Sequence, residues 1–283
     1  MDLKGEIRFV VSLSWRNVWR NKRRSFLTFL TIVAGSSMVL FMRSMQNGAF
    51  EQMSEDAISL LTSHVQVHEK GFREKRTLEY AFRDDRELLA EIRRTEHVKA
   101  ASRRIEAGVI LISGDSTEPV EVMGIEPSVE KDVITMESFI LPGGRFIRDN
   151  DRKSIVIGDL LAAKMGIMTG DMVSILSQGF DGSIAADYLE VVGIFRTQNR
   201  GYNSGMAFIS LAQAAETFSM SGYVSSYAIR VDEAGAVSNV RETVSSFAGA
   251  GLEVMTWEEL MPEIMQFIVL KRFGSYLYVV ILY

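Results

Sequence analysis

The chain has 283 residues, carries 31 basic and 36 acidic side chains for a net charge of −5, and contains no cysteine. The lack of cysteine excludes disulfide bonds and a thiol nucleophile, so a folded domain must be stable through packing alone. No Gly-x-x-x-x-Gly-Lys-Ser/Thr phosphate loop is present, so any ATP hydrolysis that serves this protein must come from another polypeptide.

The first 24 residues differ in charge from the rest of the chain. They hold seven basic and two acidic side chains, a local charge of +5, which leaves −10 for the remainder. Apolar residues such as Ile7 and Trp15 can share one helix face while Arg8 and Arg16 face elsewhere, which is typical of a helix in a membrane interface. We therefore predict a cytoplasmic amphipathic helix over residues 1–24. A basic run can also indicate nucleic-acid binding, but beside an apolar segment it indicates attachment to lipid headgroups.

An uncharged run of eighteen residues, 25–42, follows. As a helix it is roughly 27 Å long, close to the hydrocarbon thickness of a bilayer, so we predict a transmembrane helix over residues 25–43. Lys and Arg near a span stay on the cytoplasmic side, which places the N-terminus inside. A cleaved signal peptide is the alternative, but no small-residue cleavage site follows. Thr28, Thr31 and Gly35 share one face, which favours contact with another span.

Residues 44–270 are predicted to form an extracytoplasmic α+β domain, because many short alternating strands are interleaved with few helices. The predicted strands are 64–68, 108–112, 120–123, 155–157, 172–176, 188–195 and 227–231, and the predicted helices are 84–97, 160–165 and 211–218. Turns are predicted at 114–116 and 169–171, and a hairpin or exposed loop at 178–183.

Helical stalks are predicted at both ends of this domain. Apolar positions from Met38 to Leu60 keep a spacing of three or four, so the first span should continue outward as one helix. Thr256 and Glu259 fit a capping box, and apolar positions continue with helical spacing to Phe273. Two such stalks would pack side by side and carry movement between the membrane and the domain. Two ordinary amphipathic helices without a mechanical role are the alternative.

Residues 271–283 are predicted to begin a second transmembrane helix. The uncharged run that starts at Phe273 has eleven residues, too few to cross a bilayer as a helix. It ends without a charge or a polar cap, so we expect the natural protein to continue with the rest of this span.

The histidines do not predict a metal site. His64 and His68 are four residues apart, which on a strand separates them by about 13 Å, too far to share a metal ion. His97 is predicted to be a solvated cap at a helix end. Exposed apolar side chains near Phe180 or along the Met-rich stalk are candidates for a cargo surface, although methionine at helical spacing more often indicates plain packing.

The acidic residues do not predict a catalytic site either. Asp84 and Asp85, like Glu258 and Glu259, are adjacent pairs that point to different faces, unlike the facing carboxylates of a glycosidase. No Gly-x-Ser-x-Gly or His-Glu-x-x-His motif is present. We therefore predict no catalytic, cofactor-binding or metal-binding residue, and a membrane-tethered enzyme is disfavoured.

Four segments resemble ABC-transporter permeases of the MacB/LolC/LolE/FtsX superfamily. Residues 13–25, Leu-Ser-Trp-Arg-Asn-Val-Trp-Arg-Asn-Lys-Arg-Arg-Ser, resemble the interfacial helix with which these permeases open. Residues 63–68, 179–183 and 253–263 resemble the lipoprotein-releasing members. The resemblance implies a MacB-like domain between the first two of four spans, in the bacterial inner (plasma) membrane.

The resemblance also implies the function and the partners. The permease would form a homodimer or heterodimer, bind a separate ABC ATPase subunit, and couple ATP hydrolysis to motion of the outer domain, a process called mechanotransmission. We expect release of lipoproteins from the inner membrane, with lipid, a lipoprotein cargo or a periplasmic adaptor as further partners and with no nucleic acid. The alternatives are MacB-like export of peptides or drugs, and a two-span membrane sensor with an extracytoplasmic ligand-binding domain.

Overall fold

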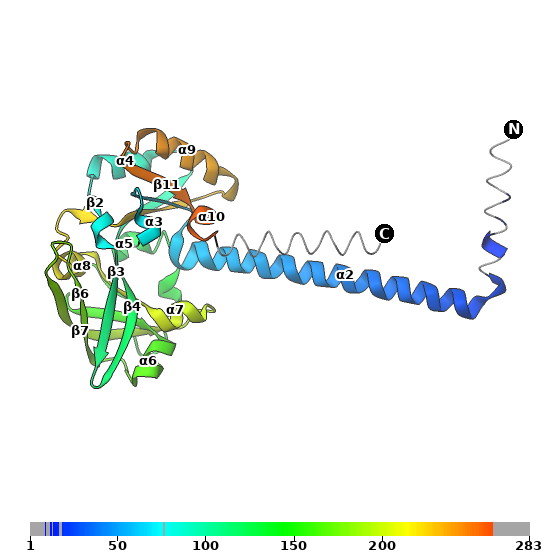
Figure 1. The fold of residues 1–283 in the computed structure, drawn as a ribbon, viewed down its shortest axis with the longest axis horizontal. Coiled ribbons are helices and arrows are strands. Elements are labelled where there is room, and N and C mark those ends of the chain that lie inside the picture. Colours follow the sequence, from blue (N-terminus) through cyan, green and yellow to red (C-terminus); the bar gives the residue numbers. More distant parts are fainter. Residues whose placement is uncertain (1–8, 10–11, 13, 17–18, 76, 263–283) are drawn as a thin grey trace. The chain divides into compact units, whose positions relative to one another are not determined.

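The computed structural model describes residues 9, 12, 14–16, 19–75 and 77–262 (Figure 1). The chain divides into two compact units: the N-terminal residues up to Met53 belong to one, and Ser54–Leu270 form the other. The predicted start of a second span at 271–283, and the part of the second stalk from Ile264 onward, lie outside the described residues.

Helix α2 (Lys22–Ala57) is one continuous helix of 36 residues. Its segment 22–46 is the one helix, within the described part of the chain, that is long and apolar enough to cross a membrane. The hydroxyls of Thr28 and Thr31 donate to the carbonyls four residues earlier, at 3.0 and 2.8 Å. These bonds satisfy the two hydroxyls within the helix, as an apolar surrounding requires. Helix α2 also continues far beyond the apolar run, as the spacing predicted.

The predicted interfacial helix at 1–24 falls largely outside the described residues. Those that are described at 14–16 and 19–20 are helical. The Trp15 and Trp19 rings lie one turn apart, with centroids separated by 6.1 Å. The Lys22 ammonium lies 5.4 Å from the Trp19 ring centroid, within the range of a cation–π contact.

The second unit is built on one large sheet with the strand order β11-β1-β10-β3-β4-β8-β5-β7-β6. Strand β6 returns to pair with β3, where Ile110–Ile112 face Ser174–Leu176, so six strands from β3 to β6 close into a barrel. The strands are β1 (Val65–Glu69), β3 (Val98–Ser113), β4 (Ser116–Ile125), β5 (Ser154–Gly158), β6 (Met172–Gln178), β7 (Ile184–Phe195), β8 (Met206–Ser210), β10 (Ser226–Val231) and β11 (Leu252–Thr256), with a separate pair β2 (Phe82–Arg83) and β9 (Tyr223–Val224).

The sixteen-residue strand β3 belongs to two lobes. Its first half, up to Arg104, pairs with β10 and carries the open sheet β11-β1-β10, which with its helices we call the open lobe. Its second half, from Arg104 to Ser113, pairs with β4 and forms one wall of the barrel, which we call the barrel lobe.

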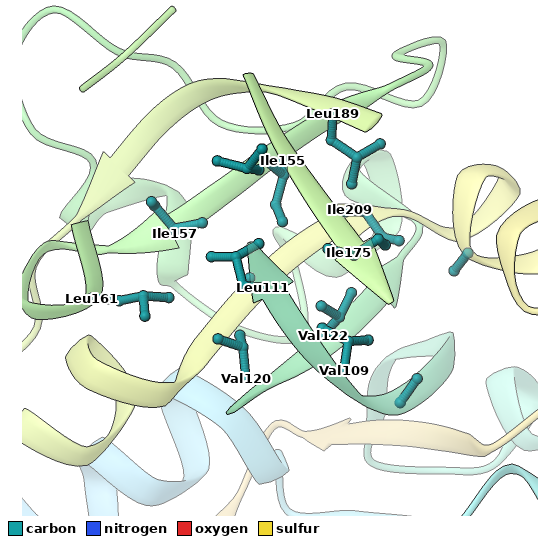
Figure 2. Packing of buried hydrophobic residues seen from close by; sticks show 14 of the residues in the cluster. Val109, Leu111, Val120, Val122, Ile155, Ile157, Leu161, Ile175, Leu189 and Ile209 are labelled. Atoms are coloured by element: carbon teal, nitrogen blue, oxygen red, sulfur yellow. The ribbon is translucent and has the colours of Figure 1, made fainter. Parts of the chain in front are cut away.

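The barrel lobe is filled by inward-pointing aliphatic side chains from all six strands (Figure 2). Along β3 every second residue faces inward, as a strand with one buried face requires: Ile105, Ala107, Val109 and Leu111 are buried. Two short helices, α6 (Asp159–Met165) and α8 (Leu211–Thr217), add Leu161 and Ala214 to the same core.

The open lobe has a core on each face of its sheet. Helices α4 (Arg86–Arg94) and α9 (Val237–Phe247) both pack on one face, through Ile92 and Val240 among others (Figure 1). On the other face, Leu60 of the π-helical turn η1 (Ile58–Thr62) belongs to a core that combines Ala228 of β10 with barrel-lobe residues such as Ile125 of β4 and Phe208 of β8, so this core is shared by the two lobes. The remaining short helices are α3 (Phe72–Lys75), η2 (Leu78–Tyr80), α5 (Pro127–Glu130), η3 (Met136–Phe139), α7 (Arg200–Gly205), η4 (Ala234–Ala236) and α10 (Trp257–Leu260).

Several predicted boundaries were wrong. The helix predicted over 84–97 is only Arg86–Arg94: the Asp85 carboxylate caps it by accepting the N–H groups of Glu87 and Leu88, and Thr95 is extended. The strand predicted over 108–112 is the second half of β3. Strands β8 and β11 and helix α9 were not predicted.

Candidate functional site

His64 and His68 belong to the packing around β1. The Val231 N–H donates to His64 Nδ1 at 3.0 Å, and burial, assisted by the positive charge of Arg230, lowers the pKa of His64 to about 4. His68 is buried, and its ring stacks on Phe72 with centroids 4.9 Å apart. Within the described part of the chain, no group of three or more metal-binding side chains comes together.

The other polar residues considered in the sequence, His97, Glu258 and Glu259, do not come together in the structure. His97 follows α4 in a left-handed conformation (φ 66°), with Nδ1 3.1 Å from Asp232 Oδ1, so it joins a turn to the end of β10. Glu258 is exposed, whereas Glu259 caps α10 and lies 3.4 Å from Arg241.

The hairpin predicted at 178–183 is confirmed, since Gly179 N–H donates to the Ser183 carbonyl at 2.8 Å. Phe180, however, is only partly exposed. Its backbone N–H donates to the Phe218 carbonyl at 2.9 Å, and its ring lies 4.7 Å from the ring of Tyr223 against the barrel core. Phe180 is therefore not the free apolar surface that the sequence suggested.

In the second unit, residues 58–64, which follow α2, lie beside residues 256–260, which contain α10; we call these two segments the entry and the exit and, together, the root. At the entry, η1 continues directly from α2 and inserts Leu60, which is 1% exposed, into the core. At the exit, the Trp257 N–H donates to the His64 carbonyl at 3.0 Å. Strands β1 and β11 pair there, with Val65 opposite Thr256. The segment that follows α2 is therefore joined to both strands.

The predicted capping box at the exit is confirmed. The Thr256 N–H donates to Glu259 Oε2 at 2.8 Å, and the Thr256 hydroxyl accepts the Glu259 N–H at 3.4 Å. The box fixes the direction in which α10 leaves β11, because it satisfies the first N–H groups of the helix.

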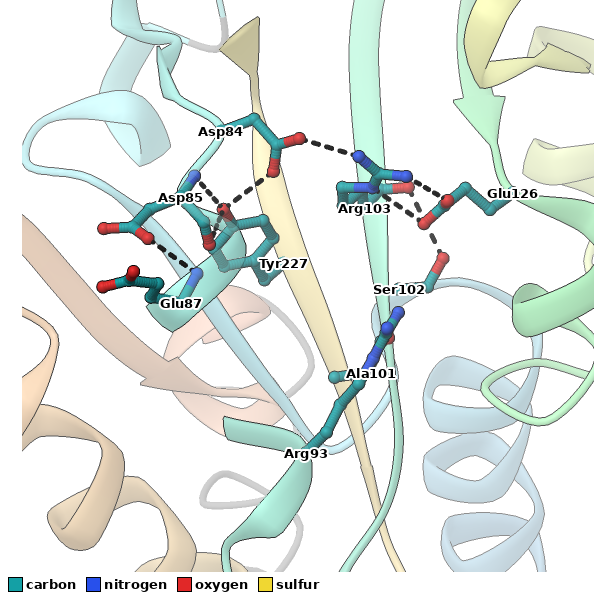
Figure 3. Close-up of polar contacts among 9 residues, drawn as sticks. All are labelled: Asp84, Asp85, Glu87, Arg93, Ala101, Ser102, Arg103, Glu126 and Tyr227. Atoms are coloured by element: carbon teal, nitrogen blue, oxygen red, sulfur yellow. Dashed lines mark hydrogen bonds and ion pairs between the residues drawn. The ribbon is translucent and has the colours of Figure 1, made fainter. Parts of the chain in front are cut away.

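A polar cluster around Arg103, which we call the Arg103 bracket, joins the two lobes (Figure 3). Arg103 lies on β3 and forms ion pairs with Asp84, at 2.7 Å, and with Glu126. Asp84 precedes α4 of the open lobe, whereas Glu126 follows β4 of the barrel lobe. The hydrogen bonds with Glu126, the largest cause, raise the pKa of Arg103, so the Arg103 guanidinium stays charged at any physiological pH.

Tyr227 of β10 completes the bracket by bonding to Asp84 and Asp85. Its hydroxyl donates to Asp84 at 3.0 Å and accepts the Asp85 N–H at 2.8 Å. Burial and the negative charge of Asp84 raise the pKa of Tyr227, so the hydroxyl keeps its proton. A cavity of about 310 Å³ lies beside Asp84 and Arg103, with Leu211 of α8 in its wall.

The Arg103 bracket was not predicted from the sequence. The sequence feature that could have indicated it is the pair of adjacent arginines, 103 and 104, in a segment otherwise typical of a strand. Adjacent residues of a strand point to opposite faces, so each arginine needs a partner on its own face. The partners of Arg103 lie 19 and 23 residues away along the chain, and Tyr227 lies 143 residues from Asp84, so spacing alone cannot assign them.

Comparisons with known proteins agree with this architecture. A family model described as the MacB-like periplasmic core domain matches residues 25–247. The periplasmic region of MacB from Actinobacillus actinomycetemcomitans is similar in structure, with a TM-score of 0.50 and 13% identity, over 75% of this chain and 95% of that one. The extracellular domain of the ABC-type transporter YknZ from Gram-positive bacteria has a TM-score of 0.48 and 13% identity, over 68% of this chain and 98% of that one. No curated protein matches the chain.

Proposed function

Because the chain belongs to the ABC-transporter permeases that carry a MacB-like periplasmic core domain, we propose that it is a permease subunit that releases lipoproteins from the bacterial inner membrane. A separate ATPase subunit hydrolyses the ATP, and this chain carries no catalytic residue. The permease acts as a dimer, either with itself or with a related subunit.

The proposed topology follows the charge of the chain. Residues 1–24, with a charge of +5, lie on the cytoplasmic surface, and residues 25–43 of α2 cross the membrane. The domain at 44–270 lies on the outer side, and residues 271–283 begin the return span.

The proposed movement of the outer domain passes through the root. A hydrogen bond between Trp257 N–H and the His64 carbonyl joins the entering and leaving segments beside the buried Leu60. When ATP-driven closure inside the cell moves α2, Leu60 moves the core that it shares with Ala228 of the open lobe and Phe208 of the barrel lobe, and β1 moves with it. The Arg103 bracket also couples the two lobes, because it ties α4 to the end of β4.

The choice of lipoproteins as cargo is supported by three segments that resemble lipoprotein-releasing permeases: 63–68, 179–183 and 253–263. In the structure, two of them meet. Residues 63–68 contain the start of β1, and residues 253–263 contain the end of β11 and the helix α10. Strands β1 and β11 pair at the root.

The proposal is tested by reconstituting the full-length protein in proteoliposomes, with and without the partner ATPase, and measuring ATP hydrolysis and release of an acylated lipoprotein. We expect no hydrolysis by this chain alone and both activities with the partner. Leu60→Ala should reduce release per ATP hydrolysed, because it leaves a void at the root, whereas Met168→Ala, at a 69% exposed position, should not.

Robust ATP hydrolysis by the isolated chain would refute the permease assignment. Transport of a peptide or drug by the complex, with no lipoprotein released, would refute the cargo assignment alone.

A further inference from the structure

A glycine interrupts the outer face of the barrel lobe. Val109 and Leu111 of β3 and Val120 of β4 point into the core (Figure 2), so their neighbours point outward. Gly108 therefore belongs to the outer face, opposite Glu121 of β4. A Cβ atom added at Gly108 would meet no atom within 4 Å. The absence of a side chain leaves a hollow that opens to solvent.

The edge of β3 is also unpaired at this point. Pairing with β10 ends at Arg104 and pairing with β6 begins at Ile110, so no strand within the described residues pairs with residues 105–109 along that edge. Two serine hydroxyls approach instead: Ser177 donates to the Gly108 carbonyl at 2.7 Å, and Ser225 accepts the Glu106 N–H at 3.0 Å. The gap widens the hollow into a groove.

The groove has two connected parts. The larger, about 540 Å³, extends over β4, β3 and β6 and is lined by Glu106–Ile110, Pro119–Glu121, Leu176 and Ser177. The smaller, about 300 Å³, is lined by Thr77–Glu79, Gly108, Ser177–Phe180 and Gly182. Both parts include Gly108 and Ser177, which makes them one surface.

The chemistry of the groove is divided between aliphatic and acidic groups. Ile110 and Leu176 face each other across the β3–β6 seam and are 42% and 40% exposed. The carboxylates of Glu79, Glu106 and Glu121 lie along the same lining, and neither lysine nor arginine is among the described residues that line it. Such a surface complements a ligand that is both aliphatic and positively charged.

We propose that this groove, which we call the Gly108 groove, docks an extended polypeptide segment that alternates basic and aliphatic side chains. An extended chain repeats its side chains on one face every 6.6 to 6.8 Å or so, the same repeat as Gly108 and Ile110 on β3. A basic side chain can then occupy the hollow over Gly108 beside Glu106 and Glu121, while the next side chain on that face packs on Ile110 and Leu176. Its backbone lies over the groove and does not add to the sheet as a strand, because the Gly108 carbonyl and the Glu106 N–H are already bonded to Ser177 and Ser225.

The test uses the full chain in uncharged detergent and a fluorescein-labelled octapeptide of alternating leucine and lysine, with binding followed by fluorescence anisotropy and empty micelles as the blank. A peptide of alternating leucine and glutamate is the charge control. We expect Gly108→Leu to weaken binding at least tenfold because it fills the hollow. Gly235→Leu, at an exposed glycine of η4 where an added Cβ also meets nothing, should leave binding within twofold.

A second variant separates docking from folding. Glu106→Gln with Glu121→Gln keeps the backbone and the shape of the groove, and should weaken binding about tenfold and remove most of its salt dependence. The exposed pair Glu190→Gln with Glu258→Gln is its control. Thermal denaturation verifies that each variant is folded, and if Gly108→Leu does not fold, the glutamine pair decides.

Equal binding by Gly108→Leu and the unmodified chain would overturn the proposal. So would equal binding of the lysine and glutamate peptides, or binding that the glutamine pair leaves unchanged.

Discussion

Arg104 and Glu130 form an ion pair in which neither side chain has any solvent exposure. Arg104 is the residue at which β3 changes partners, since it faces Ser226 of β10 on one side and Ile125 of β4 on the other. The pair holds α5 against this branch point, on the face opposite the Arg103 bracket. Successive arginines thus fix the two faces of one strand where the lobes meet.

Removing one partner of this ion pair should destabilise the protein more than replacing both partners by apolar residues. Glu130→Ala leaves the Arg104 guanidinium buried without its counter-charge, so we expect a loss of roughly 3–5 kcal/mol of unfolding free energy. For a unit of this size that corresponds to a decrease of about 10 °C in Tm. The double variant Arg104→Met with Glu130→Leu should lose much less. Thermal denaturation of the full chain measures both, and a double variant less stable than Glu130→Ala would contradict this account.

Tyr227→Phe tests the bracket. The substitution removes the acceptor for the Asp85 N–H and the donor to Asp84 while keeping the ring, which packs edge-on against Phe82. We expect a loss of about 1–2 kcal/mol in denaturant unfolding, because two hydrogen bonds in a partly buried place lose their partner. Tyr188→Phe, at a 54% exposed tyrosine, is the control and should change stability by less than about 0.5 kcal/mol.

His64 should make the domain sensitive to acid. Its pKa is about 4 in the folded protein and about 6.5 when unfolded, so between these pH values the unfolded chain binds a proton that the folded chain does not. Stability therefore falls as the pH decreases from about 6.5 to 4 and changes no further through this group below that. The loss should reach about 3 kcal/mol.

The pH effect is measured by urea denaturation at pH values between 4 and 7. His64→Asn, whose side-chain oxygen can still accept the Val231 N–H, should remove the slope in this window, whereas His97→Asn should retain it. An unchanged slope in His64→Asn would show that another group is responsible.

Gly158 should tolerate no side chain. A Cβ atom there would lie 2.2 Å from the Asn203 carbonyl oxygen, which belongs to the backbone of α7 and cannot rotate away. We expect Gly158→Ala to cost about 1–3 kcal/mol through forced separation of β5 and α7. Gly235→Ala, where the added atom meets nothing, should be neutral. Comparable melting temperatures for the two variants would disprove the close contact.

The sequence predicted the elements that have a clear local pattern. Strand β6 and helices α6 and α8 were placed within a few residues because alternation or helical spacing was visible there, whereas β5 and β10, which are buried on both faces, were recognised as short runs rich in apolar residues. The first half of β3 was missed since Ala101, Ser102 and Arg104 are buried on both faces, which hides the alternation. Helix α9 had a readable spacing at Val237, Val240 and Val244 and was overlooked.

The candidate site was less predictable than the fold. The capping box at Thr256 is local, so its two residues could be recognised from their spacing. The Arg103 bracket and the Gly108 groove depend on which strands become neighbours, such as β3 with β6, and that pairing brings together residues about 65 positions apart in the chain. Local patterns contain no information on such closures.

The dual membership of β3 restricts how this domain can change in evolution. Losing one amino acid from the middle of the strand would turn every later side chain to the opposite face, which would expose Val109 and Leu111 and turn Ile110 into the core. The same deletion would shift the pairing register between β3 and β10 in the open lobe. Relatives can therefore vary the chemistry of this strand, but we expect them to keep its length, with insertions confined to hairpin tips such as Gly114–Asp115.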